Sequence, residues 1–337
     1  MTFKSEKPAG HILAAATITV WGTTFISSKI LLTQFTPLQV MILRFTIAYI
    51  TLTILGRRKV KTTWREEFTF FLLALTGTTF YFLFENKALT HTFASNVSII
   101  LSAAPILTAV LAHFFTKDEK ISGRVIFGSL LAFAGTALVV FNGTVVLHLN
   151  PMGDILSLGA ALCWASYSVI LKKQVNSYDP VYLTRKVLLY SILTTLPLLF
   201  AEGGNFPLRE AVRPVYLCHL LFLGVLGSGI CYVAWNMAAK KLGIVMTNNY
   251  IYLNPFITMA AAGLILHEAV TFMGVLGAAF IISGVAAAGS KKNAAGIRDI
   301  LRRISGKPQG LRTGKMDRRN GIDTELHKSA IEEENSA

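Results

Sequence analysis

The chain has 337 residues, of which 53% are hydrophobic and 15% charged, and its formal net charge is +14. An ordinary soluble domain carries about 25% charged residues, so the composition excludes a soluble globular protein. The basic charge does not indicate nucleic-acid binding, because the Lys and Arg residues separate hydrophobic segments and do not form one basic surface. The three cysteines, Cys163, Cys218 and Cys231, fall inside apolar segments without metal-ligand spacing, which is typical of small buried side chains.

Ten apolar segments follow one another along the chain, each about 17–25 residues long, which is the length of helix that crosses a hydrocarbon core. The sequence predicts transmembrane helices over residues 11–32, 38–55, 67–86, 92–115, 124–147, 153–171, 182–201, 214–239, 243–266 and 270–290. The first segment is too long for the apolar core of a cleavable signal peptide. The predicted fold class is therefore an all-α integral membrane protein with ten transmembrane helices.

Basic residues alternate between the two sides of the predicted helices. The two termini and the loops after the second, fourth, sixth and eighth helices hold 25 of the 32 Lys and Arg residues, and the opposite loops hold Lys87, Arg209 and Arg213. Cytoplasmic loops of membrane proteins are enriched in Lys and Arg. We therefore expect a multi-pass protein of the cytoplasmic membrane with both termini in the cytoplasm.

The sequence also repeats itself, with offsets of 143, 149 and 150 residues. The recurring residues are Trp21, Lys29, Gly77, Asn86, Pro105, Glu119, Gly128 and Gly135, which return as Trp164, Lys172, Gly227, Asn236, Pro255, Glu268, Gly277 and Gly284. Each repeat holds an odd number of helices, so the second copy is inverted in the bilayer, as in many transporters. The predicted organisation is a cytoplasmic N-terminus (1–10), two five-helix repeats (11–147 and 148–290) and a charged, mostly disordered cytoplasmic tail (291–337).

At these positions the sequence resembles the drug/metabolite transporter superfamily, specifically its ten-helix EamA-type members. The matching motifs are Trp21-Gly22 with Lys29, Arg44-Phe45, Ala88-Leu89, Pro105 to Glu119-Lys120-Ile121-Ser122, and Asn254-Pro255 to His267-Glu268. The likeness covers residues 10–290, and one departure is that the first Pro-to-Glu segment is one residue longer than the second. The resemblance implies an exporter of metabolites or drugs.

A polar stripe that ends in a proline lies on both the fourth and the ninth predicted helices. The first stripe contains Ser98, Ser102 and Pro105, and the second contains Asn248, Tyr252 and Pro255. Because lipid offers polar groups no partner, we expect these faces to line a substrate cavity. The alternative is close helix packing through small and hydroxyl side chains. Each proline is expected to kink its helix.

Aromatic and amide side chains on four further helices are predicted to line the same cavity. They are Trp21, Tyr81, Asn86, Trp164, Tyr167, Tyr232, Trp235 and Asn236. Aromatic rings suit flat or apolar substrates, through stacking and cation–π contacts. The alternatives are core packing for the tryptophans and an interfacial aromatic belt for the other rings.

Charged side chains inside the predicted helices need partners, because a charge at the bilayer centre costs roughly 2.5–3.5 kcal/mol. We expect Arg44 and Glu85, both toward the outer side, to form an ion pair. Glu85 is also the acidic residue best placed to carry a coupling proton, and transport without a protonatable residue is the alternative. On the inner side, the corresponding residues are Lys172, Arg185 and Lys186, with Asp179 as the only acidic candidate partner.

The fifth and tenth predicted helices carry glycines seven residues apart, which predicts a close-packed seam and a scaffolding role. The first, third, fourth, sixth, eighth and ninth helices are expected to line the central cavity of a secondary transporter. It would export small organic metabolites or drugs, amino acids or related compounds among them, by alternating access. The expected partners are a small-molecule substrate, the lipid bilayer and a coupling ion such as the proton. No phosphate-binding loop, metal-binding motif or nucleophile motif predicts a cofactor or an enzyme. The alternatives are a passive facilitator or channel and a membrane-embedded enzyme.

Overall fold

The structure is a computed structural model that describes residues 7–56, 60–91, 97, 100–116, 122–141, 151–204, 207–257 and 272–289. All of these belong to one compact unit, Met1–Ser290, and every regular element among them is a helix. Six helices are long and apolar enough to cross a membrane: Pro8–Leu32, Pro37–Leu55, Trp64–Ala88, Pro151–Val175, Pro180–Ala201 and Pro214–Leu242. This agrees with the prediction of an all-α membrane protein. The predicted tail, Glu119, Glu268 and Ser98 lie outside the described residues.

In chain order the elements are α1 (Lys7–Leu32), α2 (Pro37–Leu55), α3 (Trp64–Ala74), η1 (Leu75–Thr79), α4 (Phe80–His91), α6 (Ala104–Phe115), α7 (Gly123–Phe141), α8 (Pro151–Val175), α9 (Pro180–Ala201), α10 (Leu208–Ala211), α11 (Pro214–Leu221), η2 (Phe222–Ile230), α12 (Cys231–Leu242), α13 (Ile244–Asn248), η3 (Asn249–Tyr252) and α15 (Phe272–Gly289). The third and eighth predicted helices each contain a π-helical segment, η1 and η2. The ninth passes from α13 into a 3-10 turn, η3.

Two of the long helices begin at a capped proline. Before Pro37, Thr36 and Gln39 form a capping box in which each side chain hydrogen-bonds the backbone N–H of the other residue, at 3.3 and 2.9 Å. Before Pro180, Asp179 Oδ1 accepts the first free N–H groups of α9. These caps satisfy donors that have no partner inside the helix, and the prolines begin the helices without losing a hydrogen bond.

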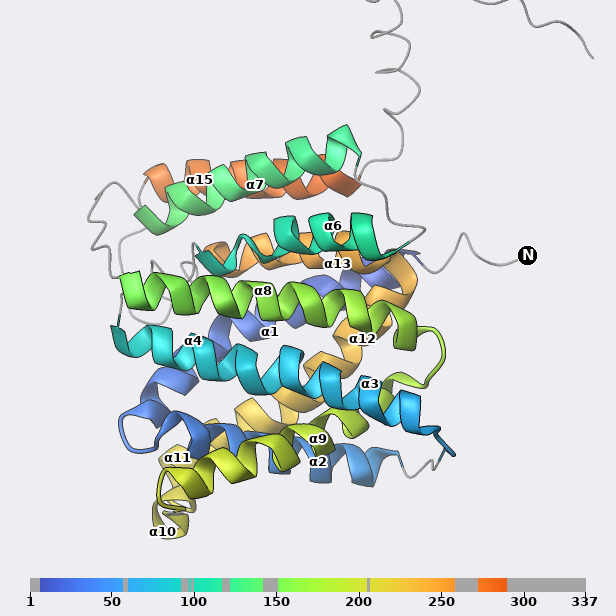
Figure 1. Cartoon of the computed structure of the whole chain (residues 1–337). Helices are drawn as coiled ribbons and strands as arrows, with labels where there is room; N and C mark the ends of the chain where they lie inside the picture. Colours follow the sequence, from blue (N-terminus) through green and yellow to red (C-terminus); the bar gives the residue numbers. More distant parts are fainter. Residues whose placement is uncertain are drawn as a thin grey trace, which may run out of the picture. The chain divides into compact units, whose positions relative to one another are not determined.

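The helices pack in pairs that join distant parts of the chain. Contacts are extensive between α7 and α15, between α4 and α8, between α1 and α12, and between α2 and α9. Figure 1 shows α7 beside α15 at one edge of this unit, and α2 with α9 near the opposite edge. The helices α4, α8, α1 and α12 lie between these two pairs. The largest cluster of buried hydrophobic residues lies among these central helices.

The predicted glycine seam is confirmed at the contact of α7 with α15. A Cβ on Gly128 would come within 2.5 Å of the Gly284 carbonyl, and a Cβ on Gly135 within 2.6 Å of the Gly277 carbonyl. Only glycine allows two backbones to approach this closely. Since the first glycine of α7 faces the second of α15, the two helices run antiparallel.

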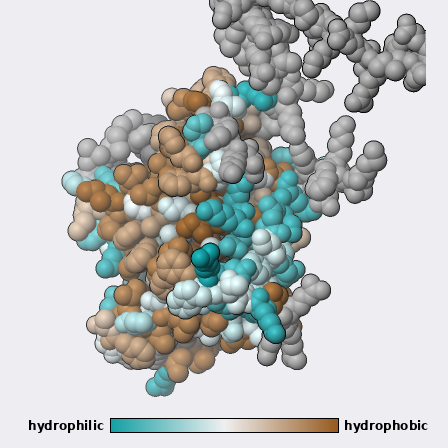
Figure 2. Space-filling view, turned by 45° about the vertical axis from the view of Figure 1, so that its right-hand side comes forward, coloured by the Kyte–Doolittle hydropathy of each residue, from teal (hydrophilic) through white to brown (hydrophobic). Residues whose placement is uncertain are grey.

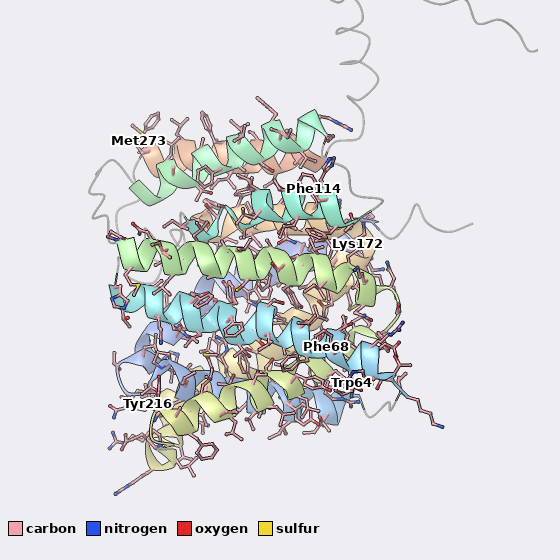
Figure 3. All side chains as sticks on the ribbon, viewed as in Figure 1. Trp64, Phe68, Phe114, Lys172, Tyr216 and Met273 are labelled. Carbon is pink, nitrogen blue, oxygen red and sulfur yellow. The ribbon has the colours of Figure 1, made fainter. Side chains whose placement is uncertain are left out.

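Large hydrophobic side chains cover the helix flanks, as a membrane environment requires. Trp64 is 83% exposed and Phe114 75% exposed, and Figure 3 labels Trp64 at the start of α3 and Phe114 near the end of α6. In Figure 2 hydrophobic residues dominate the visible face, and hydrophilic residues gather over the helix ends that lie on the right of Figure 1. Lys172, at the end of α8, is labelled on that side in Figure 3.

Candidate functional site

Six aromatic side chains from four helices meet in the middle of the helical unit, and we call them the aromatic cluster. They are Trp21 on α1, Tyr81 on α4, Trp164 and Tyr167 on α8, and Tyr232 and Trp235 on α12. Neighbouring ring centroids in the cluster lie 5.1 to 6.4 Å apart, most of them tilted or edge to face. These are the preferred geometries of aromatic pairs. The structure thus brings together every aromatic candidate of the sequence except Tyr252.

The two central tryptophans place their indole N–H groups on polar acceptors. Trp21 Nε1 donates to the Gly227 carbonyl at 2.9 Å, and Trp164 Nε1 donates to Asn248 Oδ1 at 2.8 Å. A buried indole usually finds such a partner, because an unpaired N–H in an apolar site destabilises the fold. Each ring therefore has an apolar face toward its neighbours and one fixed polar edge.

The π-helical segments supply two backbone carbonyls to the aromatic cluster. Gly227 lies in η2 and accepts from Trp21, and Gly77 lies in η1 and accepts from the Tyr232 hydroxyl at 3.1 Å. Tyr167 packs directly on Gly77, since a Cβ there would come within 2.2 Å of the Tyr167 ring. π-helical turns shift the backbone register and are frequent at functional sites. Here they bring main-chain oxygens next to aromatic rings inside an apolar unit.

Two asparagines extend the polar edge of the cluster. Asn236 Oδ1 accepts from the Tyr167 hydroxyl at 3.4 Å, and its amide nitrogen donates to Thr184 at 3.0 Å. Asn248 Nδ2 donates to Ser168 at 3.1 Å and to the Ile244 carbonyl at 2.9 Å. Both amides are buried. They offer donors and acceptors that a polar ligand in the cluster could share.

Arg44 and Glu85 are both buried beside the cluster. Arg44 Nε donates to Ser228 Oγ at 2.8 Å, and the guanidinium lies 4.5 Å from the centroid of the Phe82 ring. The Glu85 carboxylate lies beside the Tyr81 hydroxyl and within electrostatic range of Arg44. Arg44 is therefore held by a hydroxyl and an aromatic face, while the carboxylate acts on it from a greater distance than in a direct ion pair.

The other predicted site residues are distributed differently. Asn86 and Ser102 are buried. Pro105 is in the first turn of α6, directly after a break at Ser102 and Ala103, so the fourth predicted helix is interrupted there. Pro255 is buried and follows η3. Tyr252 is 0% exposed and packs in a separate cluster with Ala132, Ile281 and Val285, which belong to α7 and α15.

A polar network between α3 and α9 corrects the expectation for Lys186. Its Nζ lies 2.6 Å from Glu67 Oε1, and the Tyr190 hydroxyl donates to Glu67 Oε2 at 2.6 Å. Thr62 donates to the same carboxylate. Asp179, the acidic residue expected near Lys186, instead caps α9, because its carboxylate is needed by the free N–H groups there. We call Thr62, Glu67, Lys186 and Tyr190 the α3–α9 network.

Beyond this network, hydroxyl pairs join η1 to α9. Thr78 Oγ1 lies 2.6 Å from Ser191 Oγ, and Thr79 Oγ1 lies 2.7 Å from Thr194 Oγ1. None of these partnerships was predicted from the sequence. The one available signal was Glu67, an acidic residue at the start of a long apolar segment, which needs a cation from another helix.

Comparison with known proteins identifies the family to which the chain is similar. The model of the EamA-like transporter family matches residues 8–141 and again residues 151–289. An uncharacterized transporter of Archaeoglobus fulgidus is 30% identical over 280 residues, covering 82% of this chain and 95% of that protein. A probable amino-acid metabolite efflux pump of Escherichia coli is 23% identical, covering 81% of this chain and 92% of that protein.

Two further likenesses concern substrate names and fold. A probable terminal-alkyne amino-acid exporter of Streptantibioticus cattleyicolor is 25% identical, covering 80% of this chain and 89% of that protein. A crystal structure with 18% sequence identity superposes with a TM-score of 0.69, covering 84% of this chain and 99% of the other, and shows the fold alone. The match of the family model to both halves is decisive: this chain belongs to the EamA-like transporter family.

Proposed function

We propose that this chain is a secondary transporter that exports small organic metabolites, amino acids or related compounds among them, across the cytoplasmic membrane by alternating access. The observation that carries the proposal is the aromatic cluster, to which α1 and α4 contribute from the first half and α8 and α12 from the second. A movement of one half against the other would open such a cluster. The names of the amino-acid exporter and efflux-pump relatives support the substrate class.

The proposal includes ten transmembrane helices in two inverted repeats, with both termini in the cytoplasm. The separate family matches to the two halves support it, as does the reciprocal contact of Gly128 with Gly284 and of Gly135 with Gly277. Cysteine labelling tests the orientation in a variant without the native cysteines. We expect Asn205→Cys to be labelled from outside and Ser177→Cys from the cytoplasm, and the reverse pattern would overturn the orientation.

We propose that the apolar part of the substrate binds against the faces of the tryptophans and tyrosines, by stacking. The charged groups of an amino acid need polar partners in a site shielded from water. The carbonyls of Gly77 and Gly227 suit an ammonium group, and the amides of Asn236 and Asn248 suit either charged end. At present these carbonyls and amides accept hydrogen bonds from the indole groups and tyrosine hydroxyls of the cluster. The bound substrate would replace those hydrogen bonds with its own.

The α3–α9 network is proposed to close the cytoplasmic side of the site. In the proposed orientation, the start of α3 and the start of α9 both face the cytoplasm. The bonds of Glu67 to Lys186 and Tyr190 hold these two ends together. Opening toward the cytoplasm would separate them, at the cost of a partly buried ion pair.

Counterflow in proteoliposomes tests the function. Vesicles loaded with an unlabelled amino acid should accumulate the labelled compound transiently and saturably, as an alternating-access carrier requires. We expect Trp164→Ala to abolish this exchange and Trp64→Ala, at a residue 83% exposed, to leave it intact. Flux without saturation or counterflow would indicate a passive channel, and chemical conversion of the compound would indicate an enzyme.

A further inference from the structure

Three buried polar side chains lie away from the aromatic cluster, where the ninth predicted helix contacts α7. They are Ser129 on α7 and Asn249 and Tyr252 on η3, which are 4%, 1% and 0% exposed. Among the described residues, both polar atoms of the Asn249 amide have no hydrogen-bond partner, and the Ser129 and Tyr252 hydroxyls have no partner other than each other. Buried polar groups are nearly always satisfied, so this group indicates a bound ion or water between the side chains.

The three side chains face one region. η3 is a 3-10 turn, in which residues i and i+3 eclipse one another, so Asn249 and Tyr252 share one side of it. The Tyr252 hydroxyl lies next to the Ser129 hydroxyl. Tyr252 also packs on Ala132, which is close to one turn beyond Ser129 on α7. The region is distinct from the aromatic cluster, since Asn248 turns its own amide to Trp164.

We propose that Ser129, Asn249 and Tyr252 form a binding site for a small monovalent cation, with sodium as the ion. The three side chains offer an amide oxygen and two hydroxyl oxygens, which are ligands for hard cations. All three are neutral, so they could not balance the charge of a divalent ion, which carboxylates usually do. Neutral oxygens together with main-chain carbonyls of interrupted helices coordinate sodium in other transporter folds.

The backbone of the ninth helix favours such a site. α13 ends at Asn248, and the chain continues as the 3-10 turn η3 before Pro255. The proline has no N–H to donate to the carbonyl one turn earlier, which weakens the hydrogen-bond ladder at this point. Main-chain oxygens near η3 are therefore available to complete the coordination of the ion.

The position of the site connects the ion to the aromatic cluster. Asn249 belongs to the ion site, and its neighbour Asn248 holds Trp164 through a hydrogen bond of 2.8 Å. A bound ion would fix η3 against α7 and, through one peptide unit, fix the acceptor of the Trp164 indole. This part of the inference rests on the proposed function, because it makes sodium the coupling ion of the exporter.

Sodium binding to the purified full-length protein tests the site without any transport substrate. We expect saturable binding of radioactive sodium that unlabelled sodium displaces and that choline does not. Asn249→Leu, which keeps the volume and removes the amide, should weaken the affinity by about tenfold or more, the effect of losing one good ligand. Ser129→Ala and Tyr252→Phe should weaken it in the same direction. Thr136→Val on α7 is the matched control, because its hydroxyl already donates to the Ala132 carbonyl at 3.1 Å.

Thermal unfolding gives a second measurement. A ligand that binds only the folded protein raises the melting temperature, so sodium chloride should stabilise the native protein relative to choline chloride. That gain should shrink in Ser129→Ala, the mildest of the three changes. If the native protein shows no saturable sodium binding, or if the three variants bind sodium as the control does, the site is a structural polar contact only. Either result would leave amino-acid counterflow, and so the exporter proposal, unaffected.

Discussion

Trp21 and Trp164, 143 residues apart in the chain, lie edge to face with ring centroids 5.5 Å apart and an interplanar angle of 85°. Their rings are in contact, but their indole N–H groups donate hydrogen bonds to different acceptors. Trp21 donates to a main-chain carbonyl of η2, and Trp164 donates to the side chain of Asn248. The two tryptophans thus make similar apolar contacts, but their hydrogen bonds differ.

Trp164→Phe removes the indole N–H and keeps one aromatic ring in the cluster. We expect Trp164→Phe to lower kcat/KM for amino-acid counterflow by about tenfold, the effect of one buried hydrogen bond. Trp64→Phe is the control, because Trp64 is 83% exposed and is outside the cluster. Equal activity of the two variants would mean that the Trp164–Asn248 bond has no part in transport.

The two glycines of the π-helical segments should differ in their tolerance of alanine. At Gly77 a Cβ would lie 2.2 Å from the Tyr167 ring, whereas at Gly227 the nearest atom is Thr24 Cγ2 at 3.2 Å. Gly77→Ala forces the ring to move, so we expect a loss of about 1–3 kcal/mol of stability, as in other overpacked cores. Gly227→Ala should cost less.

Melting temperatures of the purified variants measure this difference. In a Tyr167→Ala background, Gly77→Ala should cost less stability than it costs in the native protein, since the clash is removed. If Gly77→Ala is as stable as the native protein, the close contact between this backbone and the Tyr167 ring is not a constraint on the fold.

Hydropathy predicted the positions of the six long apolar helices because lipid selects long apolar segments. The second predicted helix, 38–55, corresponds to α2, Pro37–Leu55, and the seventh, 182–201, to α9, Pro180–Ala201. Hydropathy could not predict the π-helical segments η1 and η2, because a shift in backbone register leaves composition unchanged. The break before Pro105 had a sequence signal, since proline disfavours helix at the residue before it.

The aromatic candidates came together because repeat positions and helical faces constrain them jointly. Their binding role stays a prediction. Partners across helices were harder to predict. Lys186 finds Glu67 on α3, and Tyr252 faces α7 and α15, away from Trp164. Such contacts depend on helix rotation, and helical periodicity in one sequence does not fix the rotation of one helix against another.

The α3–α9 network should keep the cytoplasmic end closed. Ser191→Cys serves as the reporter. Ser191 is buried, it is hydrogen-bonded to Thr78, and it lies further from the starts of α3 and α9 than the network does. We expect Glu67→Gln to raise its labelling from the cytoplasmic side by about twofold to fivefold, which corresponds to about 0.4–1 kcal/mol for a partly exposed ion pair. Glu67→Lys combined with Lys186→Glu should restore slow labelling.

The control for this experiment breaks the other salt bridge among the described residues. Glu210→Gln removes the partner of Arg213, at 2.9 Å in the native protein, and should leave Ser191→Cys labelling unchanged. If Glu67→Gln also leaves it unchanged, the network stabilises the fold without acting as a gate.

Glu85 is the remaining candidate for proton coupling. A coupling carboxylate must change its surroundings between the two states, because its proton affinity depends on nearby charges, hydrogen bonds and water. Glu85 and its neighbour Tyr81 lie on the same helix, α4, and Arg44 lies on α2 of the same half. A movement of one half against the other would keep these three together, while Ser228 and Tyr232 of the second half would move away from them. We therefore expect Glu85→Gln to leave the response of export to an imposed pH gradient unchanged in proteoliposomes.

The comparison needs both gradient-driven flux and counterflow, because a damaged protein loses both. If Glu85→Gln keeps counterflow and loses only the response to the pH gradient, Glu85 carries the proton. If both persist, Glu85 serves to offset the buried charge of Arg44. In that case a sodium gradient should drive export by the native protein and fail to drive export by Asn249→Leu. The reason is that coupling would then come from sodium bound by the neutral oxygens around η3, and not from a proton on the Glu85 carboxylate.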